Sequence, residues 1–346
     1  MKKILLALVA ASAGAQSPTP DSFNRATPPD SYLNRSAVEE FLNRVSREQG
    51  LDRSALNALF GPLTPAEDVL AKISKPAEKS KEWFEYKKIF DDPARLEAGV
   101  EFFKTHRAQF EAAEKRFGVD KYLIAAILGI ETRYGKVSGK TPVLQALATL
   151  CFDYPPRAKF FCGELEAYLR LSQRERFDSP AIVGSYAGAM GMAQFMPTSY
   201  LNDAIDGDGD GKVDLFNSPA DAIFSIGNYL KNRGWKAAEN GLYAQQLPDD
   251  GGLKDFGKSI KPYQPIKDIY QDPKTYALEL RTWLDAHPQE TVGTLNLQGE
   301  AGKEYWLVRH NFYVITRYNS SPMYAMAAVN LARAISQSLA TGKNTP

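Results

Sequence analysis

The stretch LIAAILGIETRYG, residues 123–135, places a single carboxylic acid at the end of an almost wholly apolar run. A helix that is hydrophobic on every side is normally buried in a large core. Residues 119–130 are therefore predicted to form a central helix that is terminated by Gly135. Isoleucines seven and four positions before Glu131 lie on the same helical face as this acid. Glu131 is expected in or beside the core.

The predicted surroundings of Glu131 suit a general acid. Burial and the negative end of the helix dipole both disfavour a charged carboxylate. We therefore expect a raised pKa at Glu131, which is how a general acid for glycoside cleavage is made. A helix-end glutamate satisfied by an arginine or a backbone donor is the alternative, because structural ion pairs also perturb pKa values. The apolar pattern alone leaves both interpretations open.

Length and charge bound the class of protein. The chain has 346 residues, 24% of them charged, and a formal net charge of +1. It is long enough to bury a sizeable core and to hold two or three domains. Nucleic-acid binding and a polybasic membrane anchor both need clustered Lys and Arg, so this charge balance gives neither any support.

The N-terminus has the pattern of a secretory signal peptide over residues 1–15. Met1-Lys2-Lys3 precedes an apolar run at 4–11, and Ala13-Gly14-Ala15 is an Ala-x-Ala cleavage pattern. The run is too short to span a bilayer as a mature helix, and no cysteine stands near the cleavage point to carry a lipid. We expect a soluble exported chain with a flexible leader over residues 16–30.

Most of the remaining chain is predicted to be helical. Apolar residues keep helical spacing over 38–45, 83–90 and 96–117, and Asp52 is placed to cap a helix that includes residues 55–60. Residues 141–171 are predicted to form two helices broken at Tyr154-Pro155-Pro156, because proline excludes the helical conformation before it.

The pattern changes between residues 246 and 303, where glycines, prolines and short alternating runs appear. Residues 294–297 and 305–308 flank two glycines and resemble a β-hairpin. Residues 311–335 return to helical spacing, although 311–318 alone fits either a helix or a strand. The fold is predicted to be mainly α, an α+β arrangement in which a small β-containing insert interrupts a helical core.

Cys151 and Cys162 are the only cysteines in the chain. An even count in an oxidising compartment permits a disulfide, and two buried free thiols are the alternative. The distance between the two backbones decides between them, and the sequence leaves it open.

The run SYAGAMGMAQFMP, residues 185–197, combines small residues with two polar side chains. Its glycines let the backbone approach another chain or a ligand closely. Ser185 and Gln194 can hydrogen-bond a sugar amide or hydroxyl. A tightly packed loop that enters a helix is the alternative for this run.

The run DGDGDGK, residues 206–212, has the pattern of a calcium loop. Asp206, Asp208 and Asp210 match positions 1, 3 and 5 of an EF-hand, with Gly211 at the turn position. A solvated acidic loop without metal is the alternative, but acids drawn together repel strongly unless a cation is bound.

The closure of this loop departs from the EF-hand pattern. The usual bidentate glutamate at the twelfth position is replaced by Asn217, which offers only one neutral oxygen. Asp221 is the next acid and is predicted to cap the following helix. We therefore expect a longer loop that is closed by Asp221, with the carbonyl of Lys212 as the backbone ligand.

Together these stretches resemble a known family, the lytic murein transglycosylases of the membrane-bound B type, family 103 of the glycoside hydrolases. The resemblance runs from the region of Trp83 to the C-terminus. Five motifs occur in family order: GIETRYG at 129–135, FDYPPRA at 152–158, the 185–197 run, the 206 loop with SPADA at 218–222, and ITRYN at 315–319.

The resemblance implies a lysozyme-like helical core with an EF-hand-like calcium site. On this chain the core would comprise residues 86–245 and 309–346, with the EF-hand-like loop at 206–221. A helical N-terminal domain would occupy 31–85, and the small β-containing domain would occupy 246–308.

The resemblance also implies roles for individual residues. Glu131 matches the family's catalytic acid/base. The positions that match the sugar-binding groove are Ser185, Gln194, Phe195, Tyr86, Tyr318, Asn319 and Tyr324. The family often has two arginines after its Tyr-Pro pair, and here the first is Pro156, which leaves only Arg157 to reach a peptide stem or a sugar. The leader also departs from the lipoprotein form of the family, which favours a soluble periplasmic enzyme.

The chemistry implied by the resemblance needs one acid. Glu131 would protonate the oxygen between N-acetylmuramic acid and N-acetylglucosamine, and would then take the proton of the muramyl C6 hydroxyl as that oxygen closes on C1. The product is a 1,6-anhydro sugar. Because the nucleophile belongs to the substrate, proximity replaces a second catalytic residue.

Two alternatives remain at this point. A hydrolysing muramidase would use the same Glu131 with a second acid, such as Asp153, facing it. A calcium-stabilised peptidoglycan-binding protein without turnover is the other, and an acid in a buried helix argues against it. The expected partner is the glycan strand of peptidoglycan, and the resemblance leaves room for other cell-wall synthesis or hydrolysis enzymes.

Overall fold

The structure is a computed structural model that describes residues 28–74, 81–250, 255–269, 281–282 and 285–342. The predicted signal peptide lies outside the described residues. The chain divides into two compact units, each of which is considered by itself. The α7 unit, named after helix α7 (Lys121–Thr132), contains the described residues of 77–134 and 223–346. The α8–α9 unit, named after α8 (Val143–Phe152) and α9 (Ala158–Glu175), contains those of 6–76 and 135–222.

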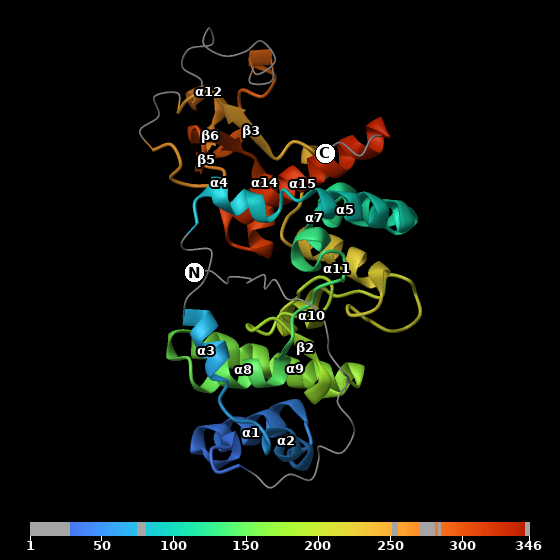
Figure 1. Cartoon of the computed structure of the whole chain (residues 1–346), viewed down its shortest axis with the longest axis vertical. Helices are drawn as coiled ribbons and strands as arrows, with labels where there is room; N and C mark the ends of the chain where they lie inside the picture. The colour runs from blue at the N-terminus through green and yellow to red at the C-terminus, as the bar shows by residue number, and fades with distance from the viewer. Residues whose placement is uncertain (1–27, 75–80, 251–254, 270–280, 283–284, 343–346) are drawn as a thin grey trace. The chain divides into compact units, whose positions relative to one another are not determined.

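Helix α7 is the buried centre of its unit. Every residue from Leu123 to Thr132 is buried, and the side chain of Asp120 caps the first turn by accepting from the backbone N–H of Tyr122 at 2.8 Å. Three helices pack against α7 and are seen around it in Figure 1: α5 (Pro93–Thr105), α6 (Arg107–Phe117) and α15 (Pro322–Thr341). The predicted central helix, with Glu131 buried in it, is confirmed.

The end of α7 differs from the prediction. The helix ends at Thr132, three residues before the predicted terminator Gly135, and Arg133 and Tyr134 already have a left-handed backbone. The N–H groups of Arg133 and Tyr134 donate to the carbonyls of Gly129 and Leu128, each at 3.2 Å, which satisfies the last turn. A second difference concerns residues 96–117, where one continuous helical pattern was predicted. The structure has two helices there, α5 and α6, because His106 leaves the helical conformation.

Two glycines lie inside helices of this unit, where glycine costs about 1 kcal/mol relative to alanine. A Cβ added at Gly99 of α5 would lie 2.2 Å from the hydroxyl oxygen of Tyr134, and one added at Gly129 of α7 would lie 2.3 Å from it. The close approach of this tyrosine is the physical reason for glycine at both positions.

A four-stranded antiparallel sheet also belongs to the α7 unit, in the order β3 (Ala244–Leu247), β6 (Gly302–Val308), β5 (Thr291–Gly299), β4 (Gln264–Pro265). The predicted hairpin is confirmed as β5 and β6, which pair from Gly293 with Val308 to Gly299 with Gly302. Further helices of the unit are α4 (Trp83–Tyr86), α12 (Ile266–Ile269), α14 (His310–Tyr318) and most of α11 (Pro219–Asn232). Residues 311–318, which fitted either structure, are thus helical.

In the α8–α9 unit the two naming helices lie side by side (Figure 1). A 3-10 turn, Pro155–Arg157, separates them, so the predicted proline break is confirmed. A disulfide joins Cys151 at the end of α8 to Cys162 in the first turns of α9. The unit also contains α1 (Ser36–Gln49), α2 (Arg53–Phe60), α3 (Glu67–Ser74), α10 (Pro197–Asp203) and the paired strands β1 (Thr141–Pro142) and β2 (Val183–Gly184). Asp52 caps α2 as predicted.

A polar network ties the start of the described chain to the end of α8. The buried hydroxyl of Tyr32 donates to Asp153 and lies 3.3 Å from the hydroxyl of Thr149. Arg35 forms an ion pair with the other oxygen of Asp153 at 2.7 Å. Burial, followed by the neighbouring Asp153, raises the pKa of Tyr32, so the phenol stays a donor. Both oxygens of Asp153 are thereby engaged.

No helix in the described ranges combines the length and apolar character needed to cross a bilayer. The three-part domain division drawn from the sequence stays a prediction.

We expect Tyr32→Phe to lower the free energy of unfolding by about 1–2 kcal/mol, because the partly buried carboxylate of Asp153 loses a donor. Urea unfolding followed by circular dichroism measures the change. Tyr154→Phe is the control, since the Tyr154 hydroxyl has no hydrogen bond to any described residue. Equal stability of the Tyr32 variant and the parent would show that the network contributes nothing.

Candidate active site

Glu131 lies in the last turn of α7 with 5% of its surface exposed. The hydroxyl of Tyr324 donates to its Oε1 at 2.6 Å. Tyr324 lies in the first turn of α15, where the side chain of Ser321 caps the helix by accepting from the N–H of Tyr324. Burial, and then the negative charge of Glu131, raise the pKa of Tyr324 well above its usual value. The tyrosine therefore remains protonated and donates to the acid.

Other aromatic residues of the predicted groove surround this pair within the α7 unit. Tyr318 at the end of α14 and Tyr86 in α4 both lie close enough to Tyr324 to raise its pKa further. The ring of Tyr318 packs edge-on against Tyr229 with 4.9 Å between centroids. Asn319 accepts from the N–H of Ser321, which holds the turn that leads into α15. The structure thus brings Tyr86 and Tyr318 close to Tyr324, which contacts Glu131, and Asn319 lies in the turn before α15.

The 185–197 run lies in the α8–α9 unit as a closed loop before α10. Ser185 exchanges hydrogen bonds with Ala189: its N–H donates to the carbonyl at 2.9 Å, and its Oγ accepts from the N–H at 3.0 Å. Met190 and Phe195 pair through both backbone groups. Because the Ser185 oxygen accepts from backbone N–H groups, its own proton can be donated to a ligand oxygen.

Gln194 occupies a strained place in this loop, with a left-handed φ of 48°. Its side-chain amide donates to the carbonyls of Gly191 at 2.9 Å and Ser138 at 3.2 Å. A non-glycine residue in this conformation persists only where its surroundings hold it. The run is therefore a tightly packed loop, and this packing also fixes the positions of its polar side chains.

Arg157 ends the 3-10 turn that contains Pro156. Its guanidinium lies over the rings of Phe160 at 4.5 Å and Phe161 at 4.9 Å. Burial lowers the pKa of Arg157. Within the described part of the chain it forms no ion pair, so its planar donors remain available for an anion.

The predicted calcium loop gathers its three aspartates. Carboxylate oxygens of Asp206, Asp208 and Asp210 all lie within 4.8 Å of one another. Asp206 accepts from the N–H groups of Gly209 at 2.6 Å and Gly211 at 2.8 Å, and these hydrogen bonds lower its pKa. Three ionised oxygen donors on a tightly turned loop fit a hard cation such as calcium.

The structure corrects the expected position of Asp221. It was predicted to cap the helix, whereas α11 already begins at Pro219 and Asp221 lies in its first turn. Its two oxygens accept from the N–H groups of Gly207 at 2.7 Å and Asp214 at 2.6 Å. Asp221 is 1% exposed and joins the two ends of the loop through backbone groups.

Two residues of this loop were missed by sequence reasoning. Asp214 accepts from the side-chain amide nitrogen of Asn217 at 2.9 Å, which fixes the orientation of that side chain. Ser218 donates to Asp208 at 2.9 Å. Acid and hydroxyl residues close to a calcium motif were a signal for both roles, but only the backbone path shows which contacts form.

The predicted calcium loop also supports the 185–197 run. The N–H of Met192 donates to the carbonyl of Leu215 at 2.7 Å, and a Cβ at Gly191 would lie 2.5 Å from the same oxygen. Leu215 in turn donates its N–H to the buried hydroxyl of Tyr200. The 185–197 run thus packs against the segment around Leu215, which follows the three aspartates.

Close to Glu131 in the sequence, Arg133 forms an ion pair with Asp92 at 2.9 Å. Asp92 also caps α5.

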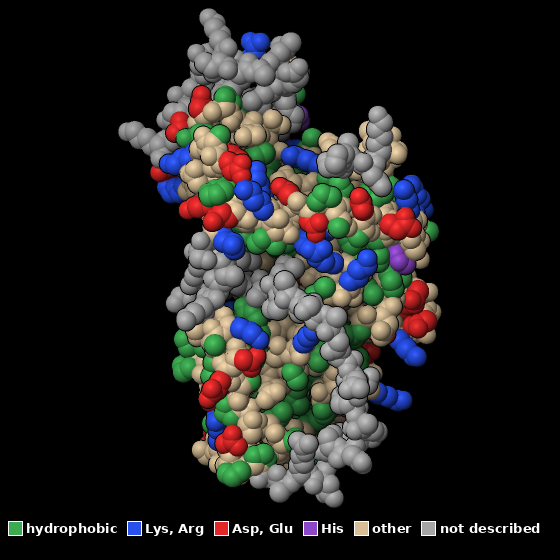
Figure 2. Space-filling model, viewed as in Figure 1, with side chains coloured by type: hydrophobic (Ala, Val, Ile, Leu, Met, Phe, Trp, Pro, Cys, Tyr) green, Lys and Arg blue, Asp and Glu red, His purple; other side chains and the backbone are tan. Residues whose placement is uncertain are grey.

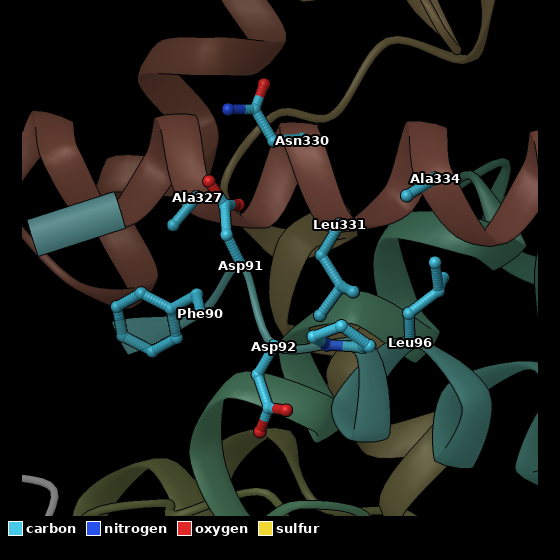
Figure 3. Close-up of a pocket in the computed structure, with 9 residues that line it drawn as sticks. Phe90, Asp91, Asp92, Leu96, Ala327, Asn330, Leu331 and Ala334 are labelled. Carbon is cyan, nitrogen blue, oxygen red and sulfur yellow. The ribbon is translucent and has the colours of Figure 1, made fainter. Parts of the chain in front are cut away.

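A cavity of about 230 Å³ lies beside Asp92, lined by residues of α15, of the start of α5 and of the segment before α5. Figure 3 shows the side chain of Asp91 directed towards α15 and that of Asp92 directed away from it. Burial raises the pKa of Asp91.

Acidic and basic side chains are interspersed on the face of the molecule shown in Figure 2. This agrees with the near-zero net charge and with the absence of clustered Lys and Arg in the sequence.

Comparisons with known proteins give consistent matches. The sequence profile of the transglycosylase SLT domain matches residues 34–333. The chain is 35% identical over 295 residues to the membrane-bound lytic murein transglycosylase B of Escherichia coli, a match that covers 83% of this chain and 79% of that protein.

Two crystal structures are similar over most of their length. Soluble lytic transglycosylase SltB1 from Pseudomonas aeruginosa is 37% identical with a TM-score of 0.76, covering 88% of this chain and 99% of that one. Escherichia coli lytic transglycosylase Slt35 in complex with calcium is 33% identical with a TM-score of 0.77, covering 95% and 100%.

Removal of the Tyr324 hydroxyl tests its link to Glu131. We expect Tyr324→Phe to fold and to lower kcat on peptidoglycan sacculi by about 10²-fold, the usual effect of losing one aligned donor in an active site. Release of soluble muropeptides measures the rate. Tyr122→Phe is the matched control, because the Tyr122 hydroxyl has no hydrogen bond to the described residues. A kcat within twofold of the parent would disconnect Tyr324 from the chemistry.

Proposed function

This chain belongs to the transglycosylase SLT domain family, and we propose that it cleaves peptidoglycan with Glu131 as its catalytic acid and base. The enzyme class is that of a lytic murein transglycosylase, with a role in cell-wall remodelling. The observation that carries the residue assignment is a buried carboxylate whose partner is a neutral tyrosine donor. Such a setting lets one group give and later take a proton.

Four other buried acids hold the local backbone through hydrogen bonds. Asp120, Glu164, Asp221 and Glu239 each accept a hydrogen bond from a backbone N–H group. Burial raises the pKa of Asp120, Glu164 and Asp221, and the backbone hydrogen bonds oppose this shift while they fix the local backbone. Glu131 differs from these four in lying in the last turn of a buried helix, where its carboxylate meets Tyr324 of the predicted groove.

In the proposed reaction Glu131 protonates the glycosidic oxygen between N-acetylmuramic acid and N-acetylglucosamine. Glu131, now a carboxylate, then accepts the proton of the muramyl C6 hydroxyl while that oxygen attacks C1. The bond to N-acetylglucosamine breaks and a 1,6-anhydromuramyl end forms, with no water consumed. Attack from within the substrate needs no second protein carboxylate, because the nucleophile is already positioned.

The α8–α9 unit supplies the residues proposed to hold the sugar. Ser185 orients the N-acetyl group through its free hydroxyl proton, and Gln194 and Phe195 line the groove. Arg157 meets an anionic group of the peptide stem or the sugar. Tyr86, Tyr318, Asn319 and Tyr324 are the groove residues contributed by the α7 unit.

The hydrolysing alternative requires a second carboxylate that activates water. Asp153 was its candidate, and both oxygens of Asp153 are engaged by Tyr32 and Arg35. This engagement favours the internal attack by the C6 hydroxyl over hydrolysis.

We further propose a structural calcium ion held by Asp206, Asp208 and Asp210, with the carbonyl of Lys212 and with Asp221 closing the loop. Support comes from the convergence of the three carboxylates and from the calcium complex of the similar Slt35. Calcium would neutralise the negative charge of the aspartates and stabilise the Leu215 segment, against which the 185–197 run packs.

The chain is proposed to act in the periplasm on peptidoglycan strands after export and cleavage of residues 1–15. The support is the signal-peptide pattern of the sequence. Other cell-wall synthesis or hydrolysis enzymes are its proposed protein partners.

Glu131→Gln is expected to fold and to lose nearly all activity, because it keeps the shape of the side chain and removes the transferable proton. Mass spectrometry of muropeptides released from purified sacculi measures both the rate and the product. The parent should yield 1,6-anhydromuramyl ends. Activity of Glu131→Gln within tenfold of the parent would refute the acid/base role, and chiefly reducing ends would favour the hydrolase.

Calcium should raise the thermal midpoint and chelation should lower it. Saturation of a site specific to the folded state at a hundredfold excess over Kd stabilises it by about 2.7 kcal/mol. The calcium-dependent part of the shift should be largely lost in Asp221→Asn and kept in Asn217→Ala. Differential scanning fluorimetry with and without calcium separates this part from the metal-independent effect of Asp221 on the loop. Loss of the shift in Asn217→Ala alone would place the closure at the usual twelfth position.

A further inference from the structure

The chain directly after Glu131 has an unusual backbone. Arg133 and Tyr134 are consecutive non-glycine residues with φ of 49° and 61°. Side chains with a Cβ rarely adopt this conformation, and it persists where the surrounding structure holds it. The chain also leaves the α7 unit directly after Tyr134. Some contact must therefore fix this exit from the helix that carries Glu131.

Both side chains reach α5. Arg133 pairs with Asp92 at the start of that helix. Tyr134 is 6% exposed, and its ring lies 5.3 Å from that of Phe102. Its phenol enters the space left by the two helical glycines, one on α5 and one on α7, where an added Cβ would meet the hydroxyl oxygen at 2.2 or 2.3 Å. Tyr134 thus fills the contact between the two helices.

The contact on α7 is made in the turn that carries Glu131. Gly129 precedes Glu131 by two residues, and its carbonyl accepts from the N–H of Arg133. The carbonyl of Leu128 accepts from the N–H of Tyr134 itself. Tyr134 therefore fixes this turn twice, by its backbone and by its ring, on the side of α5, while Tyr324 holds the Glu131 carboxylate from α15.

We propose that Tyr134 is a positioning residue for Glu131: wedged between Gly99 and Gly129, it fixes the last turn of α7 so that the carboxylate meets both Tyr324 and the scissile oxygen. The inference rests on the proposed role of Glu131. Tyr134 does not touch substrate in this scheme and acts only through the helix end. A misplacement of about 1 Å in such a site costs about 10²-fold in rate.

Three variants of the full chain test this role from different sides. Tyr134→Leu removes the wedge, Gly129→Ala pushes it away from α7, and Gly99→Ala pushes it away from α5. Each is expected to lower kcat by about 30-fold or more with KM changed less than threefold, because a misplaced acid affects the transition state rather than binding. The pH of maximal kcat should also shift, since the contact of Glu131 with Tyr324 changes.

The double variant Gly129→Ala/Tyr134→Leu should be no slower than the slower single variant, because both changes remove one and the same contact. Tyr134→Phe keeps the ring and is expected to retain at least a third of the parent kcat. Gly163→Ala is the matched control for a glycine-to-alanine change within a helix, because a Cβ at Gly163 meets nothing within 4 Å. Its kcat should equal that of the parent.

Circular dichroism and thermal unfolding establish which variants fold, and kcat is expressed per folded molecule. A folded variant of the first three that keeps the parent kcat and pH profile overturns the inference, as does a loss that appears only in KM. If none of the three folds, Tyr134 is a stability residue and the positioning role is wrong. Glu131→Gln, measured in parallel, separates a failure of the positioning role of Tyr134 from a failure of the proposed function. An active Glu131→Gln would refute the proposed function whatever the Tyr134 variants do.

Discussion

The structure depends on placing one carboxylic acid at the end of a helix that has no exposed face. Helix α7 must be covered on all sides, and α5, α6 and α15 provide this cover. An acid at the edge of such a core needs a partner, because an uncompensated buried charge is expensive. Tyr324 supplies one from a helix that lies 193 residues further along the chain. A neutral donor at this point allows the acid to change its protonation state within the core.

Each of the two units holds its own predicted functional residues through internal contacts. In the α7 unit, helix ends hold Glu131 and the tyrosines. In the α8–α9 unit, a closed loop holds Ser185 and Gln194, and the segment after the aspartate loop supports it through Leu215. A structural cation would then influence the loop that is proposed to bind sugar through packing, without touching substrate. Positions on rigid elements are what an oriented internal attack demands.

The departures from expectation share one physical cause. Asp221 looked like a helix cap because it precedes an amphipathic run, yet it accepts hydrogen bonds from the backbone N–H groups of Gly207 and Asp214 in the preceding loop. Asp153 looked available as a second carboxylate, yet Tyr32 and Arg35 engage it. Gly135 looked like the end of α7, yet Arg133 and Tyr134 already turn left-handed, held by α5. In each case the structure shows a contact that the local sequence pattern did not identify.

The sequence by itself determined the helical class, the buried helix with its acid, the proline break between α8 and α9, the β5–β6 hairpin and the acidic loop. These follow from periodicity, turn residues and local spacing, which act within a few residues. Only the tertiary structure decided that Tyr324 meets Glu131, that Cys151 and Cys162 are bridged, and that Tyr134 fills the space over Gly99 and Gly129. Such contacts depend on how the helices pack against one another, and periodicity and turn residues do not encode that packing.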